Sequence, residues 1–265
     1  MKKIPLNNPF SAPVFYLETT LSTMLDARTL ASRGEPHGSV VAAGVQDAGR
    51  GRTANRVWKA KKGQSLLFTI LLRYPGEASF PPGITLRAGL ALSLAIEDFA
   101  PPLKGLVQVK WPNDVMIPLP GSGGNAFGKA AGILTEGDGE NVYIGIGVNV
   151  SQTEFPADIR NKAASIALAL GAPVSAARFR LLEAFLNRLH AELKEPSRQN
   201  GTWRERLEER LYMKGRRVRF IPGAAGSGKA TEGILRGIGP GGELLIQDRP
   251  GTEPEAFVTG ELEVY

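Results

Sequence analysis

The residues with the clearest capacity for chemistry are basic and amide side chains spread over three separate segments. The first segment, VQDAGRGRTANRVW at residues 45–58, places Arg50, Arg52 and Arg56 near glycines and ends on Trp58. Glycines let backbone N–H groups approach an anion closely, and the arginines add fixed positive charge. Taken alone, this pattern also fits a solvated basic turn or a nucleic-acid contact.

Two further segments add lysines beside strand-like sequence. KWPND carries Lys110, Asn113 and Asp114, and GKAAGIL carries Lys129. Cations from separate segments suggest one convergent anion site. Amides such as Asn113 and Asn149 can bind a base edge, and a carboxylate can hold magnesium. Together these residues fit a nucleotide that reacts with a second anion.

The composition excludes several other kinds of site. The chain has no cysteine and two histidines, His37 and His190, so it lacks the residues for a thiolate zinc site, a disulfide or a cysteine nucleophile. Residues 123–129 and 223–229 nearly match a phosphate-binding P-loop. Both have alanine where that motif requires Ser or Thr, and a strand pattern follows each. We therefore expect neither segment to act as a P-loop.

The elements that position these residues mix helices and strands. Helical spacing of apolar residues predicts helices over residues 21–33, 85–100, 176–195 and 202–212. Buried or alternating patterns predict strands over residues 39–46, 65–72, 106–114, 130–136 and 141–150. The last two strands form a hairpin around Asp138 and Gly139, and Lys110 should face away from the core.

Short strand patterns separated by glycine and proline follow residue 213, and they predict a small β-barrel. We expect two domains, residues 1–213 and 214–265. The predicted fold class is α+β, with a mixed β-sheet flanked by helices and the small barrel at the C-terminal end.

Net charge and hydropathy limit the kinds of ligand and the cellular location that we expect for the protein. The net charge is +6 and the pI is about 9.6, which suits an anionic ligand or partner. Pro5, Asn7, Asn8 and Pro9 interrupt any N-terminal apolar stretch, and no window holds the roughly 18 apolar residues of a membrane span. We expect a cytoplasmic protein with no membrane partner.

Five motifs in this order resemble the catalytic domain of biotin protein ligases. They are Ser22-Thr23, QDAGRGR at 46–52, KWPND at 110–114, GKAAGIL at 128–134 and GVN at 147–149. The C-terminal strands are similar to the SH3-like barrel of that family. The resemblance implies a catalytic fold like that of class II aminoacyl-tRNA synthetases. It also implies that biotin and MgATP give biotinyl-5′-AMP, from which a lysine of a biotin carboxyl carrier protein takes the biotin.

The resemblance assigns roles to individual residues. Biotin would be bound by Ser22, Thr23, Gln46, Gly49, Arg50, Lys129 and Gly132. ATP would be bound by Arg52, Arg56, Trp58, Lys110, Asn113 and Asn149. The catalytic residues would be Lys129, Arg52 and Lys110, because fixed cations offset the repulsion between two anionic reactants. Asp114 would either bind Mg²⁺ or orient Lys129.

The sequence also departs from the family's pattern. Met24 stands where Asn usually follows Ser-Thr, and the loop from Arg52 to Trp58 is one residue longer than usual. Some members carry an N-terminal DNA-binding domain, but only about twenty residues precede Ser22, so we expect a ligase that does not bind DNA. Relatives in this family often form homodimers.

Two alternative functions stay open. A lipoate–protein ligase has the same fold and also makes an acyl-adenylate, and Met24 is the main feature that favours it. A non-enzymatic basic module would bind nucleic acid through the arginine loop, with a strong dependence on salt.

Overall fold

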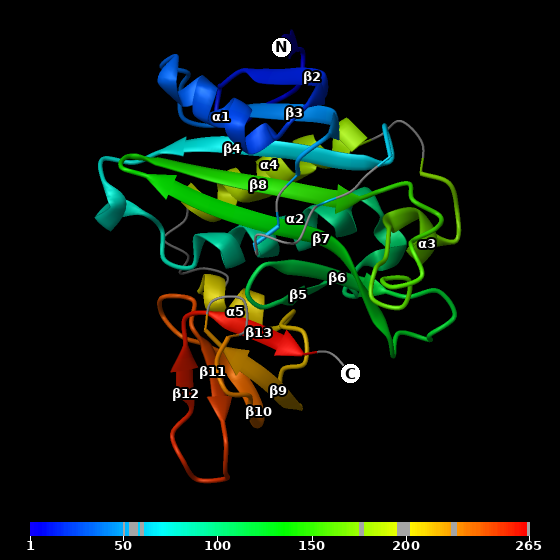
Figure 1. Cartoon of the computed structure of the whole chain (residues 1–265), viewed down its shortest axis with the longest axis vertical. Helices are drawn as coiled ribbons and strands as arrows, with labels where there is room; N and C mark the ends of the chain where they lie inside the picture. Colours follow the sequence, from blue (N-terminus) through cyan, green and yellow to red (C-terminus); the bar gives the residue numbers. More distant parts are fainter. Residues whose placement is uncertain are drawn as a thin grey trace.

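The computed structural model in Figure 1 describes residues 1–49, 51–52, 58, 61–174, 178–194, 202–223 and 227–263. Two predicted site residues, Arg50 and Arg56, lie outside this set. A large mixed sheet with helices packed on it occupies the upper part of the view, and a smaller antiparallel sheet lies below it. The predicted α+β class with a mixed sheet is confirmed.

In the described part of the chain, the large sheet has eight strands in the order β1-β2-β3-β4-β8-β7-β6-β5. Their bounds are β1 Lys2–Ile4, β2 Val14–Thr20, β3 Ser39–Gln46, β4 Ser65–Arg73, β5 Gln108–Lys110, β6 Asp114–Pro118, β7 Phe127–Asp138 and β8 Asn141–Asn149. β2 and β3 run parallel, and the other neighbours are antiparallel.

Helices cover both faces of this sheet, and this explains why β3 and β4 are almost continuously apolar. α2 (Ile84–Phe99) and α4 (Arg178–Lys194) pack on one face, where Phe68 contacts Phe185. α1 (Thr23–Ser32) packs on the other face against Val41 and Leu71. A strand with both faces covered buries every side chain, so it loses the alternating pattern. The α1 helix covers only part of its face, and the candidate site lies on the rest.

Several element boundaries differ from the sequence-based expectation. The strand expected over residues 106–114 is divided into β5 and β6 by a turn at Trp111–Asn113, which contains a cis peptide bond before Pro112. The helix expected over 202–212 ends earlier, as α5 (Trp203–Glu208). β1, β2 and the short α3 (Ile166–Leu170) were not expected. The first helix is confirmed, because Ser22 caps it by accepting a hydrogen bond from the Met24 N–H.

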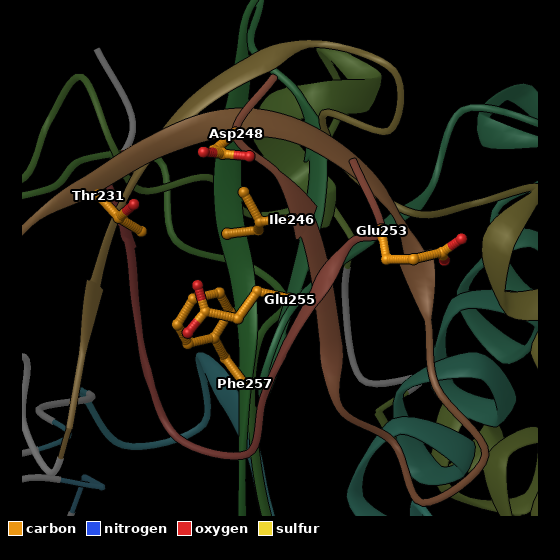
Figure 2. A pocket seen from close by; sticks show the side chains of 6 residues that line it. All are labelled: Thr231, Ile246, Asp248, Glu253, Glu255 and Phe257. Carbon is orange, nitrogen blue, oxygen red and sulfur yellow. The ribbon is translucent and has the colours of Figure 1, made fainter. Parts of the chain in front are cut away.

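The smaller sheet has five described strands, in the order β12-β11-β10-β9-β13, and every pair is antiparallel. These strands are β9 Arg217–Pro222, β10 Thr231–Ile238, β11 Leu244–Gln247, β12 Glu255–Phe257 and β13 Gly260–Glu263. Figure 2 shows a cavity in this sheet, lined by residues that include Thr231, Ile246 and Phe257. Its volume is about 30 Å³, which leaves room only for water.

One apolar cluster joins the two sheets. It contains Leu86 and Leu90 of α2, Trp111 of the β5–β6 turn, and Phe220 and Leu235 of the smaller sheet. The Trp111 indole N–H also donates to the Gly242 carbonyl at 3.0 Å. The smaller sheet therefore shares a core with the α2 side of the large one. The domain boundary between residues 213 and 214 stays a prediction.

Candidate functional site

A glycine-lined face of β7 and β8 forms the centre of the candidate site. A Cβ atom at Gly147 would lie 2.7 Å from the Trp58 indole, and one at Gly132 would lie 3.2 Å from it. The indole therefore packs directly on backbone that a larger residue would cover. Its Nε1 is buried and has no hydrogen-bond partner among the described residues. A buried donor without a partner is rare, and a ligand group could satisfy it.

Hydroxyl and amide groups lie at one end of this face. Gln46, at the end of β3, accepts hydrogen bonds through Oε1 from the backbone N–H of Thr23 at 2.7 Å and from the Thr23 hydroxyl at 3.0 Å. Gly49 lies close to the same side chain in space, because a Cβ atom at Gly49 would lie 3.2 Å from Gln46 Nε2. Ser22 is the helix cap beside them. The structure thus brings together four of the residues predicted to bind biotin.

The other end of the face holds an ion pair. Lys129 Nζ lies 2.6 Å from the Asp114 carboxylate, with side-chain exposures of 37% and 19%. The ammonium also lies 5.9 Å from the centre of the Trp58 ring. These contacts fix a cation beside the indole on a partly open surface.

A β-bulge directs Lys129 onto this face. Val115 pairs with Ala131, but Met116 pairs with Lys129, so Ala130 is an extra residue in β7. In a regular strand, residues 129 and 132 would point to opposite faces. Here a Cβ at Gly132 would lie 3.2 Å from Lys129 Nζ, so both positions share one face. Bulges commonly redirect side chains beside functional sites.

The strand register places Lys110 in the same row. Lys110 pairs with Asp114, Asp114 with Gly132, and Gly132 with Gly147. Directly paired residues project from the same face, with Cβ atoms about 4.5–5.5 Å apart. Lys110 and Lys129 are therefore both neighbours of Asp114, although they are distant in sequence.

Arg52 is directed toward the smaller sheet. Its guanidinium donates to the Gly260 carbonyl at 2.8 Å and lies 3.4 Å from the Glu261 carboxylate. Together with Asn113 it lines a cleft of about 390 Å³, between the start of α2 and two turns of the smaller sheet. The structure thus places Arg52 and Asn113 on the same cleft and bonds Arg52 to β13.

The two asparagines predicted to bind the nucleotide donate hydrogen bonds to backbone carbonyl groups of neighbouring segments. Asn113 Nδ2 donates to the Ile133 carbonyl at 2.7 Å, which ties the β5–β6 turn to β7. Asn149 is 7% exposed, donates to the Ala164 carbonyl at 3.1 Å and accepts from Gln152 at 3.0 Å. Both amides support the segments around the site, and their contact with a nucleotide stays a prediction.

Sequence reasoning missed Thr69 and the bulge. Thr69 donates a hydrogen bond to the Thr23 hydroxyl at 2.9 Å and is fully buried. The available signal was a single hydroxyl residue inside the apolar strand sequence SLLFTILL. The bulge has no equivalent signal, because it follows from the pairing of β6 with β7.

Metal ligands do not cluster in the described residues, where no group of three or more His, Cys, Asp or Glu side chains could hold an ion. The Asp114 carboxylate faces Lys129. In proteins Mg²⁺ is often held by one or two carboxylates together with substrate phosphates. Nor does any helix in the described ranges have the length and apolar character needed to cross a membrane.

Comparison with known proteins identifies similar chains. A model of the Biotin/lipoate A/B protein ligase family matches residues 16–149. The biotin–acetyl-CoA-carboxylase ligase of Mycobacterium tuberculosis is 32% identical over 233 residues, which are 86% of this chain and 80% of that protein. The bifunctional ligase/repressor BirA of Bacillus subtilis is 35% identical over 172 residues, or 62% of this chain. That match spans 49% of BirA, so the chain covers about half of this relative.

A solved structure has the same fold. The biotin protein ligase of Aquifex aeolicus, in complex with biotin and ATP, superposes with a TM-score of 0.73 at 25% identity. The superposition covers 94% of this chain and 97% of that one, so it includes both sheets.

Proposed function

Because the chain belongs to the biotin/lipoate A/B protein ligase family, we propose that it activates biotin with ATP and transfers it to a carrier protein. The first step gives biotinyl-5′-AMP and pyrophosphate. In the second, a lysine of a biotin carboxyl carrier protein takes the biotin. The similar proteins whose names state biotin ligation or binding support this assignment over lipoate.

The observation that carries the proposal is that the two ends of the site differ in chemistry. Thr23 and Gln46 offer neutral hydrogen-bonding groups at one end, and Lys129 offers a cation at the other. The glycine-lined face and the Trp58 indole lie between them. Biotin has a matching division, with a neutral ureido ring at one end and a carboxylate at the other.

The cations serve the chemistry of two anionic reactants. A carboxylate oxygen of biotin attacks the α-phosphorus of ATP, and pyrophosphate leaves. Lys129 and Lys110 would offset the repulsion between carboxylate and phosphate and stabilise the charge that develops in the transition state. In the second step, the lysine amine attacks the acyl carbon, loses a proton, and AMP leaves. Holding both reactants in one site supplies much of the acceleration.

Asp114 has a positioning role in this scheme. Its carboxylate lies beside Lys129 and is flanked by Lys110 in the strand register, so it is placed to hold a lysine in one orientation. Magnesium would enter with the ATP phosphates and add positive charge there, and Asp114 beside Lys129 would be the carboxylate that holds it. Both Mg²⁺ and ATP belong to the proposal.

The carrier partner is also part of the proposal. The net charge of +6 favours an acidic partner, because complementary charge raises the rate of encounter. The similarity to carboxylase ligases supports a biotin carboxyl carrier domain as that partner.

The deciding experiment is pyrophosphate–ATP exchange with biotin and, separately, with lipoate. We expect exchange with biotin, and transfer of label from biotinyl-AMP to an isolated carrier domain. Exchange with lipoate alone would assign the chain to lipoate activation. Salt-sensitive binding of DNA or RNA with no exchange would favour a nucleic-acid module.

A further inference from the structure

Thr69 is a buried polar residue near the middle of β4, on the sheet face that carries the glycines. The residue is 0% exposed, and its hydroxyl lies 2.9 Å from the hydroxyl of Thr23. Gly145 of β8 is its direct partner, and a Cβ there would lie 3.4 Å from Thr69 Oγ1. A buried hydroxyl requires a hydrogen-bond partner, and in the described part of the chain Thr23 is that partner.

The direction of each hydrogen bond around Gln46 follows from the donors. A backbone N–H always donates, so the Gln46 atom 2.7 Å from the Thr23 nitrogen is the carbonyl Oε1. The Thr23 hydroxyl lies 3.0 Å from the same oxygen and therefore donates to it. Its only proton is then used, so Thr23 accepts from Thr69. The hydroxyl chain runs from Thr69 to Thr23 to Gln46.

This chain leaves a defined set of groups for a ligand. Gln46 keeps its Nε2 donors, and these lie beside Gly49, where a Cβ atom would lie 3.2 Å from Nε2. Thr23 keeps one lone pair as an acceptor, because an oxygen that donates once and accepts once has a single lone pair left. A ligand that matches this end must therefore present a C=O group and an N–H group together.

We propose that Thr69 is a positioning residue: by donating to the Thr23 hydroxyl it holds that group in the orientation set by Gln46, and thereby supports selection of a cyclic urea. This inference rests on the proposed function and goes beyond it to substrate selection. A ureido ring carries the required C=O and N–H groups, whereas the dithiolane ring of lipoate carries neither. A site built to hydrogen-bond a substrate rejects strongly an analogue that lacks those groups, because its own polar groups are left unpaired.

The test compares Thr69→Val, which keeps the side-chain shape and removes the hydroxyl, with Thr69→Ser, which restores it. Calorimetric titration with biotin should show about tenfold weaker binding for the Val variant, the effect of one hydrogen bond. The affinity for lipoate, measured by competition with biotin, should change less than about twofold. The dithiolane ring makes no hydrogen bond that the Thr69–Thr23–Gln46 hydroxyl chain supports. The ratio of biotin to lipoate affinity therefore falls about tenfold.

Kinetics separate this role from a general structural one. In pyrophosphate exchange, Thr69→Val should raise the KM for biotin and leave kcat at saturating biotin nearly unchanged, because the cationic end is untouched. Thr69→Ser should restore the KM. Ser93→Ala is the matched control: Ser93 is equally buried, but its hydroxyl donates to the Leu90 carbonyl within α2. It should not change biotin affinity.

Each outcome bears on the inference. If Thr69→Val does not fold, Thr69→Ala removes the same hydroxyl without adding a methyl and gives the same comparison. Unchanged biotin affinity in a folded variant overturns the role of Thr69, as does a loss that Ser93→Ala reproduces. A wild-type chain that neither binds biotin nor exchanges pyrophosphate overturns the proposed function itself, so the two failures are distinct.

Discussion

The Lys129 ammonium lies 2.6 Å from the Asp114 carboxylate, although each residue belongs to a different strand and the loop between them is long. The β-bulge at Ala130 makes this contact, because it turns Lys129 onto the face that carries Gly132 and Trp58. The pair is thus the point where strand pairing, rather than sequence proximity, assembles the cationic end of the site.

Replacing Lys129 by Ala should lower kcat/KM for biotin-dependent pyrophosphate exchange by about 10²–10³-fold, because removing one fixed donor from a developing charge typically costs that much. Initial-rate assays of pyrophosphate exchange measure this change in kcat/KM. Lys104→Ala, on an exposed lysine away from the site, is the control and should retain the wild-type rate. A Lys129→Ala enzyme with full activity would remove this residue from the proposed chemistry.

Substituting Asp114 by Asn removes the charge that holds Lys129 and keeps the side-chain size. We expect a smaller loss than for Lys129→Ala, roughly tenfold in kcat, since the lysine stays but loses its fixed orientation. Titrating Mg²⁺ in the exchange assay separates the two roles of Asp114. A variant rescued fully by excess Mg²⁺ would indicate that the carboxylate serves the metal, whereas a variant insensitive to Mg²⁺ supports orientation of Lys129.

Arg52 contacts the smaller sheet and shares a cleft with Asn113, and the family resemblance predicts that it also binds ATP. Arg52→Ala should raise the KM for ATP about tenfold, as expected for loss of one charged hydrogen bond of about 1.5–3 kcal/mol. Arg217→Ala provides a matched control, since Arg217 also pairs with a glutamate of the smaller sheet but is 66% exposed. An unchanged KM for ATP would confine Arg52 to its contacts with Gly260 and Glu261.

Much of the fold could be predicted from the sequence where a single element determines the pattern. The apolar runs of β3 and β4 and the capping Ser22 gave correct elements, because burial and capping are local properties. β5 and β6 were predicted as one strand, because alternation continues through Trp111 and the turn depends on packing against the smaller sheet. β2 was missed because its exposed residues weaken the apolar signal.

The candidate site was predictable in its residue types but not in its arrangement. Lys110, Asp114 and Lys129 could be selected as charged residues in strand-like segments. Their alignment required the register of β5, β6 and β7, which the sequence does not encode locally. Asn149 has a structural role that its residue type does not indicate, because its amide supports the backbone of residue 164; its contact with a nucleotide stays a prediction.

Glu192 connects α4 to two arginines in a buried setting. Its side chain is 3% exposed and lies 2.7 Å from Arg206 and 3.8 Å from Arg87. Glu192→Gln should lower the free energy of unfolding by about 3 kcal/mol, because removing one partner leaves buried charge uncompensated. Denaturant titration measures it. Glu232→Gln, in an ion pair whose side chains are 54% and 66% exposed, should change the free energy of unfolding by less than about 1 kcal/mol. Equal losses of stability in the Glu192 and Glu232 variants would contradict this difference between buried and exposed pairs.

His190 predicts a pH dependence of stability. Burial lowers its pKa below the ordinary value of 6.5, and the charges of Lys194 and His37 lower it further. The ring packs edge-on against Phe10, with ring centres 4.7 Å apart. Because the folded-state pKa is lowered, the unfolded chain binds a proton more readily. The stabilising contribution is therefore complete above pH 6.5 and is lost as the pH falls through the folded-state value.

Thermal unfolding between pH 8 and pH 5 tests this dependence. The wild-type Tm should fall more steeply on acidification than the Tm of His190→Gln, which cannot take up the proton. Carboxylates contribute equally to both proteins, so the difference between the two slopes isolates His190. Lys194→Met should give an intermediate slope, because removing that positive charge raises the pKa of His190 toward its ordinary value. Identical slopes in all three proteins would show that His190 titrates alike in the folded and unfolded chains.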